Sequence, residues 1–133
     1  MKLRIKGDSL RLRLTRPEVE GIGRGKAVEA TTHFPDGASL RYRLETSADD
    51  TALSVCFSDG LLTVRVGLKA AVQWSSGAAV EIACFLPLRN GGELRVLVEK
   101  DFECLHPGRG ERTDGAFPNP ARPIADSQRL GPP

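Results

Sequence analysis

The sequence of 133 residues has few cysteines and no pair of them in a CxxC arrangement. Its three cysteines, Cys56, Cys84 and Cys104, are an odd number and are widely spaced. Disulfide-stabilised secreted domains usually carry an even, closely spaced set. We therefore expect free thiols, a reducing compartment and a cytoplasmic location.

Long hydrophobic runs and an excess of charge of one sign are also missing. No stretch approaches the roughly 20 apolar residues of a transmembrane helix, and residues 1–6 alternate charged with apolar side chains instead of forming a signal peptide. The 19 basic and 17 acidic residues give a net charge of +2. The composition predicts a soluble protein with no membrane partner, in which any binding of anions must depend on a local cluster of charge.

Short segments that alternate apolar and polar residues dominate the chain. Residues 1–6 and 10–14 flank a turn at Gly7-Asp8-Ser9, which is typical of a β-hairpin. The same kind of pattern, bounded by Gly, Pro, Asn and Asp, predicts further strands over 26–34, 38–46, 52–57, 61–66, 78–86 and 93–102. Because 78–86 is the most continuously apolar of these segments, we expect it to form a central strand.

Helical signals are few and short. Thr15, Pro17 and Glu18 match a capping box with proline in the first turn, and residues 68–75 place apolar side chains at helical spacing. The predicted fold class is therefore mainly β, or a β-rich α+β fold. It has seven or eight short, mostly antiparallel strands in a meander, a sandwich or a partly closed barrel, with one or two short helices. No internal repeat is evident in the sequence.

The composition changes near residue 106. Residues 107–133 contain six of the nine prolines and very few aliphatic side chains, so they cannot bury enough apolar area to offset their conformational entropy. We expect one β-rich domain over residues 1–106 and a largely disordered, Pro/Gly-rich tail over 107–133. Within the tail, only Phe117-Pro118-Asn119-Pro120 is a candidate docking segment.

Three segments resemble a known family: KLRIKGDSLRLRLT at residues 2–15, LRVLVEKDFECLHP at 94–107 and FPNP at 117–120. They are similar to a group of small bacterial proteins known only as a domain of unknown function. The resemblance spans most of residues 1–120. It implies membership of that family and brings no activity, substrate or catalytic residue with it.

The polar face of the predicted first hairpin is strongly basic. An acidic protein or another anionic ligand could bind there, and nucleic acid could bind through its phosphates. Stacking aromatics, which single strands favour, are missing, because alternation places Tyr42 on an apolar face. A solvated outer face whose charges prevent edge-to-edge pairing is the simpler interpretation. The candidate residues are Lys2, Arg4, Lys6, Arg11 and Arg13, extended by Arg41 and Arg43 if their strand is a neighbour.

A second cluster lies at the end of the last predicted strand. Its carboxylates could support acid–base chemistry or hold a cation, and its Cys-x-His pair is half of a zinc site. The simpler interpretation is that this strand packs beside the basic hairpin and that the two stripes neutralise each other. No cofactor is expected. The cluster consists of Glu99, Asp101, Glu103, Cys104 and His106.

These patterns do not specify an activity. The leading hypothesis is a small, non-enzymatic binding or interaction domain that holds an acidic partner or an anion on its basic hairpin. The alternatives are a small metal-binding protein or enzyme that uses the second cluster, and a structural subunit of an assembly.

Overall fold

A computed structural model of the protein describes residues 1–48 and 53–101. This part of the chain holds eight strands and two helices, which confirms the β-rich α+β class. The predicted tail lies outside the described residues. In chain order the elements are β1 (Lys2–Ile5), β2 (Ser9–Leu14), α1 (Arg16–Gly23), β3 (Val28–His33), β4 (Ser39–Ser47), β5 (Ser54–Ser58), β6 (Leu61–Gly67), α2 (Leu68–Ser76), β7 (Glu81–Pro87) and β8 (Glu93–Lys100).

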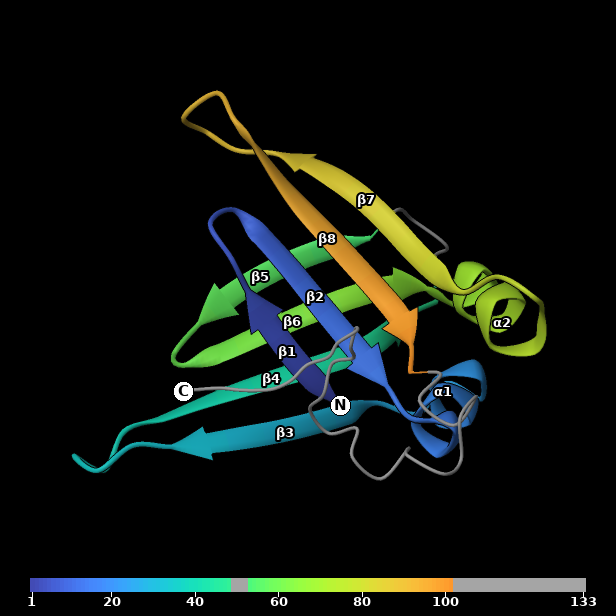
Figure 1. The fold of residues 1–133 in the computed structure, drawn as a ribbon, viewed down its shortest axis with the longest axis horizontal. Coiled ribbons are helices and arrows are strands. Elements are labelled where there is room, and N and C mark those ends of the chain that lie inside the picture. The colour runs from blue at the N-terminus through green and yellow to red at the C-terminus, as the bar shows by residue number, and fades with distance from the viewer. Residues whose placement is uncertain (49–52, 102–133) are drawn as a thin grey trace, which may run out of the picture. The chain divides into compact units, whose positions relative to one another are not determined.

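The strands form two separate four-stranded sheets. Sheet A has the order β1-β2-β8-β7 and sheet B the order β3-β4-β6-β5. In each sheet two antiparallel hairpins lie side by side, and their inner strands, β2 with β8 and β4 with β6, run parallel. Figure 1 shows sheet A lying across sheet B, with α1 and α2 together at one end. Most pairings are antiparallel as predicted, and neither sheet closes into a barrel.

The position of β7 corrects one prediction. Its sequence is the most apolar, yet β7 is an edge strand of sheet A and exposes every second residue. The central position belongs to β8, in which Val96, Leu97 and Val98 are all buried. The charged residues that flank this segment of β8 made its sequence less apolar than that of β7. Phe85 makes β7 more apolar, yet its side chain is 60% exposed.

The two halves of the chain repeat one arrangement. Residues 2–47 form a hairpin, a helix and a second hairpin, and residues 54–100 form the same series. Exchanging the halves turns the strand order of sheet A into that of sheet B. The two halves thus form an internal repeat of structure, which is not evident in the sequence.

Matching turns extend this equivalence to single hydrogen bonds. Gly37 and Gly91 occupy the same place in the β3–β4 and β7–β8 turns, with φ of 94° and 98°. Ahead of each glycine, a side-chain oxygen accepts a hydrogen bond from the backbone two residues on, Asp36 from Ala38 at 2.9 Å and Asn90 from Gly92 at 3.2 Å. Aspartate and asparagine favour this type of turn, so each half fixes its second hairpin in the same way.

The equivalent helices pack against each other and close one end of the core. Ile22 of α1 and Trp74 of α2 occupy matching positions and are both almost fully buried. The next positions, Gly23 and Ser75, are so close that a Cβ added to Gly23 would clash with both the Oγ and the Cβ of Ser75. A glycine is therefore required at this crossing.

The start of α1 also anchors β1. The Thr15 backbone N–H donates to Oε1 of Glu18 at 2.9 Å, as the predicted capping box requires. The other oxygen, Oε2, accepts from the α-ammonium group of Met1 at 2.6 Å. Burial alone would raise the pKa of Glu18, but these hydrogen bonds outweigh burial and hold the pKa below its ordinary value. One carboxylate thus joins the first strand to the first helix.

Cys56 and Cys84 are both free thiols, whereas Cys104 lies outside the described residues. Cys56 is exposed on β5 and Cys84 is half-buried. The helices of the described part are too short to cross a lipid bilayer.

Candidate anion-binding face

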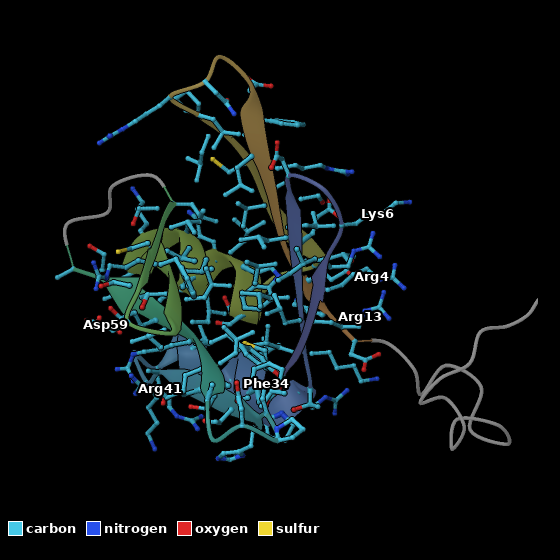
Figure 2. All side chains as sticks on the ribbon, turned by 90° about the vertical axis from the view of Figure 1, so that its left-hand side faces the viewer. Arg4, Lys6, Arg13, Phe34, Arg41 and Asp59 are labelled. Atoms are coloured by element: carbon cyan, nitrogen blue, oxygen red, sulfur yellow. The ribbon has the colours of Figure 1, made fainter. Side chains whose placement is uncertain are left out.

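The outer surface of sheet A carries the basic residues of the first hairpin. In the β1–β2 pairing Lys2 lies opposite Arg13 and Arg4 lies opposite Arg11. Figure 2 shows Arg4, Lys6 and Arg13 projecting away from the molecule on the same side, whereas Arg41 lies on the opposite side. We call this surface the basic face. It is formed by Lys2, Arg4, Lys6, Arg11, Arg13 and, from β8, Arg95.

Glu99 neutralises one end of the basic face. Its Oε2 lies 3.2 Å from Nε of Arg11 and 3.1 Å from Nη2 of Arg13. Asp101 adds a weaker contact to Lys2 at 3.9 Å. The last strand therefore lies beside the basic hairpin, as the charge pattern predicted, and it compensates part of the hairpin's charge.

Three cations at the other end of the face have no such compensation. Among the residues that the structure describes, Arg4, Lys6 and Arg95 form no ion pair and no side-chain hydrogen bond. They surround a hollow of ≈ 200 Å³. Leu97, which is only 5% exposed, contributes an apolar patch to it. The hollow is lined by Arg4, Lys6, Ser9, Arg11, Arg95 and Leu97.

A second hollow of ≈ 220 Å³ shares Arg4 and Arg11 with the lining of the first. We call the two hollows together the basic groove. Each charged side chain that the structure describes in these two linings is a cation, and Glu99 or Asp101 contacts three of them, Lys2, Arg11 and Arg13. The second hollow is lined by Lys2, Leu3, Arg4, Arg11 and Arg13.

Arg41 and Arg43 do not extend the basic face, because their strand β4 belongs to sheet B. Both are paired: Glu29 lies 3.7 Å from Arg41 and 3.1 Å from Arg43, and Glu45 lies 2.6 Å from Arg43. The hydrogen bond to Glu45, followed by that to Glu29, raises the pKa of Arg43. The hydrogen bond from Arg43, together with one from Arg65, lowers the pKa of Glu45.

The repeat separates the structural charges from the rest. Glu99 lies opposite Arg13 across β2 and β8, and Glu45 lies opposite Arg65 across β4 and β6 at the equivalent positions. The second arginine of each carboxylate differs, Arg11 of β2 in sheet A and Arg43 of β4 in sheet B. Because only the pair of Glu99 with Arg13 recurs, as Glu45 with Arg65, we assign this pair to the framework that both sheets share.

Three other cations of the basic face are specific to sheet A. Where β1 and β2 carry Lys2, Arg4 and Arg11, the equivalent positions of β5 and β6 carry Ser54, Cys56 and Thr63.

One of the two compensating acids of sheet B, Glu29, has no acidic equivalent in sheet A. Arg95 is equivalent to Arg41, which contacts Glu29. Ala83 occupies the position in sheet A that is equivalent to Glu29. One framework thus presents a neutralised surface on sheet B and a basic surface on sheet A that Glu99 and Asp101 compensate only at one end.

The chain belongs to a family of unknown function, DUF7009. The family model matches residues 1–121, which confirms the expected membership of an uncharacterised family. Neither the curated proteins nor the solved structures include a match to it. The function of this DUF7009 protein must therefore be inferred from its own surface.

The second sequence cluster lies mostly outside the described residues, which exclude Glu103, Cys104 and His106. Glu99 and Asp101 are described, and both contact cations of β1 or β2. Within residues 1–48 and 53–101 no three His, Cys, Asp or Glu side chains gather as metal ligands. The described part of the cluster serves the ion pairs of sheet A.

Sequence reasoning missed Ser9, Arg95 and Leu97 as part of this surface. Alternation along β8 places Arg95 on one side with Glu93 and Glu99. Only the strand order reveals that this side continues the basic hairpin, and a pairing between distant strands leaves no local pattern in the sequence.

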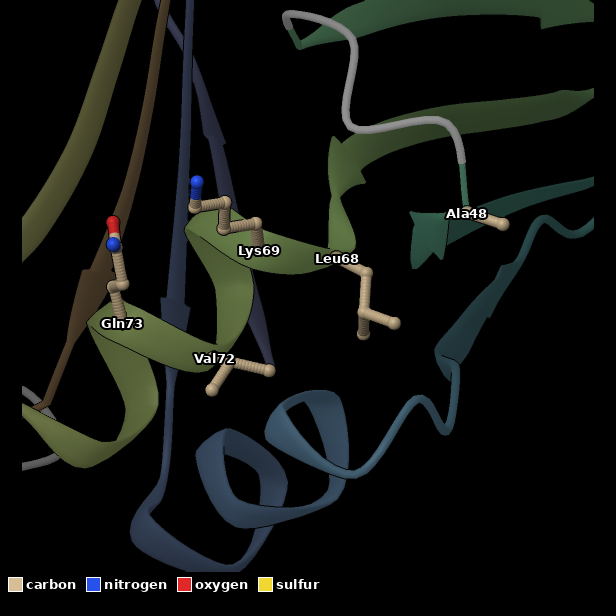
Figure 3. Close-up of a pocket in the computed structure, with 5 residues that line it drawn as sticks. All are labelled: Ala48, Leu68, Lys69, Val72 and Gln73. Atoms are coloured by element: carbon tan, nitrogen blue, oxygen red, sulfur yellow. The ribbon is translucent and has the colours of Figure 1, made fainter.

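A further hollow of ≈ 340 Å³ lies on α2 (Figure 3) and is mainly apolar. Leu68 and Val72 are exposed there, at the positions where α1 of this DUF7009 chain has Arg16 and Glu20. Among the described residues its lining holds one cation, Lys69, and it shares no residue with the described lining of the basic groove. The lining residues are Ala48, Leu68, Lys69, Val72 and Gln73.

Proposed function

We propose that this protein is a binding domain that holds an anionic ligand or the acidic surface of a partner in the basic groove of sheet A. The observation that carries the proposal is the gathering of Arg4, Lys6 and Arg95, none of them ion-paired within the described residues, around one hollow. A cytoplasmic location, where phosphate esters are abundant and thiols stay reduced, is part of this proposal.

Electrostatics support a ligand in the groove. Like charges directly opposite each other across a strand pair are destabilising, and Arg4 faces Arg11 in this way. Glu99 compensates Arg11, whereas Arg4 has no acidic partner among the described residues, so an anion beside Arg4 would relieve the repulsion that remains. Guanidinium groups bind phosphate and carboxylate oxygens with two parallel hydrogen bonds. The arginines that line the first hollow, Arg4, Arg11 and Arg95, therefore suit an oxyanion better than a monatomic anion.

The groove favours binding over catalysis. Among the described residues, its lining offers cationic donors and the Ser9 hydroxyl but no carboxylate or imidazole. A nucleophilic serine needs an adjacent general base, and no described residue of the lining supplies one. The groove can therefore neutralise and orient an anion without transforming it.

A pair of equivalent arginines provides the test. The full-length chain is titrated calorimetrically with tripolyphosphate, and Arg95→Ser is compared with Arg41→Ser. A hydrogen bond to a charged group contributes roughly 1.5–3 kcal/mol, so Arg95→Ser should lower the affinity about tenfold or more. Arg41→Ser, which changes the equivalent but ion-paired side chain, should leave the affinity unchanged.

The salt dependence completes this test. Binding should weaken steadily as the ionic strength rises, because screening shortens the reach of the groove's charge. Equal effects of the two arginine variants, or no heat of binding even at low salt, would exclude the groove as the site.

A further inference from the structure

We infer that the ligand of the basic groove is a nucleotide unit, in which an unstacked base adjoins a phosphate. This inference rests on the proposed function and names the chemical class of its ligand. The observation behind it is the position of Phe85, whose side chain is 60% exposed beside the groove.

Phe85 belongs to the same outer surface as the groove. It is the cross-strand partner of Arg95 in the β7–β8 pairing. Side chains of such partners lie about 5 Å apart at Cβ, on the same face of the sheet. Phe85 therefore borders the uncompensated end of the basic face, next to one of its unpaired cations.

The repeat shows that the framework does not need an aromatic here. The equivalent position in sheet B is Thr31, which pairs with Arg41 as Phe85 pairs with Arg95. Alternation places Phe85 away from the core, since Cys84 and Leu86 on either side of it contact the buried cluster. An exposed phenyl ring at a position that tolerates threonine indicates a contact outside the fold.

An aromatic ring beside a cationic groove suits single-stranded nucleic acid. Such proteins combine a basic track for phosphates with side chains on which bases stack. The hollow lined by Arg4, Lys6 and Arg95 offers room for a phosphate, and Phe85 offers a surface for one base. In a duplex the bases stack on each other, and their faces are not available to Phe85.

The experiment compares two ligands that differ only in their bases. A fluorescently labelled decathymidylate and an abasic deoxyribose-phosphate oligomer of the same length are titrated with the full chain, and anisotropy is recorded. Stacking of one base contributes about 1–3 kcal/mol. Decathymidylate should therefore bind about tenfold or more tightly than the abasic oligomer.

Two phenylalanine variants locate the base. Phe85→Thr introduces the residue of the equivalent position in sheet B, so the fold should persist. This variant should lose the preference for decathymidylate and keep the affinity for the abasic oligomer. Phe57→Thr, which changes a phenylalanine 65% exposed on β5 of sheet B, is the matched control and should keep the preference.

The outcomes separate this inference from the proposed function. Equal affinity for the two oligomers, an unchanged preference in Phe85→Thr, or tighter binding of a decaglutamate peptide would overturn the nucleotide and leave anion binding in place. No binding of either oligomer or of tripolyphosphate would overturn both. Thymidine monophosphate is also tested as a competitor of the labelled decathymidylate. If it competes as well as unlabelled decathymidylate at equal nucleotide concentration, the ligand is a free nucleotide and not a single strand.

Discussion

The outer faces of the two sheets are built on one framework and carry different charge. On sheet B, Arg41, Arg43 and Arg65 are all paired with Glu29 or Glu45, so the surface is neutralised internally. On sheet A only the end near Glu99 and Asp101 is neutralised. The difference arises at a few exposed positions, while the buried residues and turns of the two halves correspond.

This comparison gives the molecule an internal reference. A charge that recurs at equivalent positions, such as Glu45 and Glu99, is explained by the fold that both sheets share. A charge present in one sheet alone, such as Arg4 where the other half has Cys56, is not required by the fold. The basic groove consists mainly of charges of the second kind.

The largest expected effect concerns the shared framework. Leu12 and Val64 are equivalent core residues of β2 and β6, and each is 1% exposed. Leu12→Asp and Val64→Asp should each cost about 4 kcal/mol or more, because an unpaired carboxylate would enter the core. Chemical denaturation measures both, and Arg4→Glu, which alters an outer position of the same sheet, is the control that should stay folded.

Similar losses from the two aspartate variants are expected if both halves carry the framework. A Val64→Asp protein as stable as the parent would show that the repeat is one of topology only and that equivalent positions cannot be compared.

An intermediate effect is expected from giving sheet A the missing acid of sheet B. Ala83→Glu places a carboxylate where Glu29 contacts Arg41. The new side chain should pair with Arg95 and lower the affinity for tripolyphosphate about tenfold, the effect of roughly 1.4 kcal/mol. Ala83→Gln has nearly the same size without the charge, so it should bind like the parent. A Glu variant that binds equally well would mean that Arg95 is not part of the site.

The smallest effect concerns the neutralised face. The folded-state pKa of Glu45 is lowered, chiefly by the hydrogen bond from Arg43, so its contribution to stability is present above the unfolded pKa of about 4.3 and is lost as the pH falls through the folded value. Glu45→Gln should lose up to about 1 kcal/mol at pH 7, because such partly exposed pairs contribute little. Denaturation curves recorded from pH 7 down to pH 3 should show parent and variant converging. A difference that persists at pH 3 would assign the loss to packing.

Much of the fold could be predicted from the sequence, because hairpins and capping boxes are local. Period-two alternation and the turn at Gly7-Asp8-Ser9 predicted β1 and β2, and Thr15 with Glu18 predicted the start of α1. The strand order is not local, so the edge position of β7 and the contribution of Arg95 to the groove could not be predicted.

The repeat was hidden for a related physical reason. Strands need alternation, and many residue types satisfy it, so the two halves keep their geometry with different side chains. Arg4 and Cys56 occupy equivalent positions in the framework, but their side chains differ in charge, size and chemistry. Only the pairing of the strands shows that they are equivalent.

The central claim is that anions bind to sheet A and not to sheet B. A titration of the ¹⁵N-labelled full chain with tripolyphosphate, followed by amide chemical shifts, tests it most directly. The account predicts saturable shifts at Arg4, Lys6, Ser9 and Arg95, and none at the equivalent Cys56, Ser58 and Arg41. Equal shifts on both sheets, or shifts confined to sheet B, would contradict it.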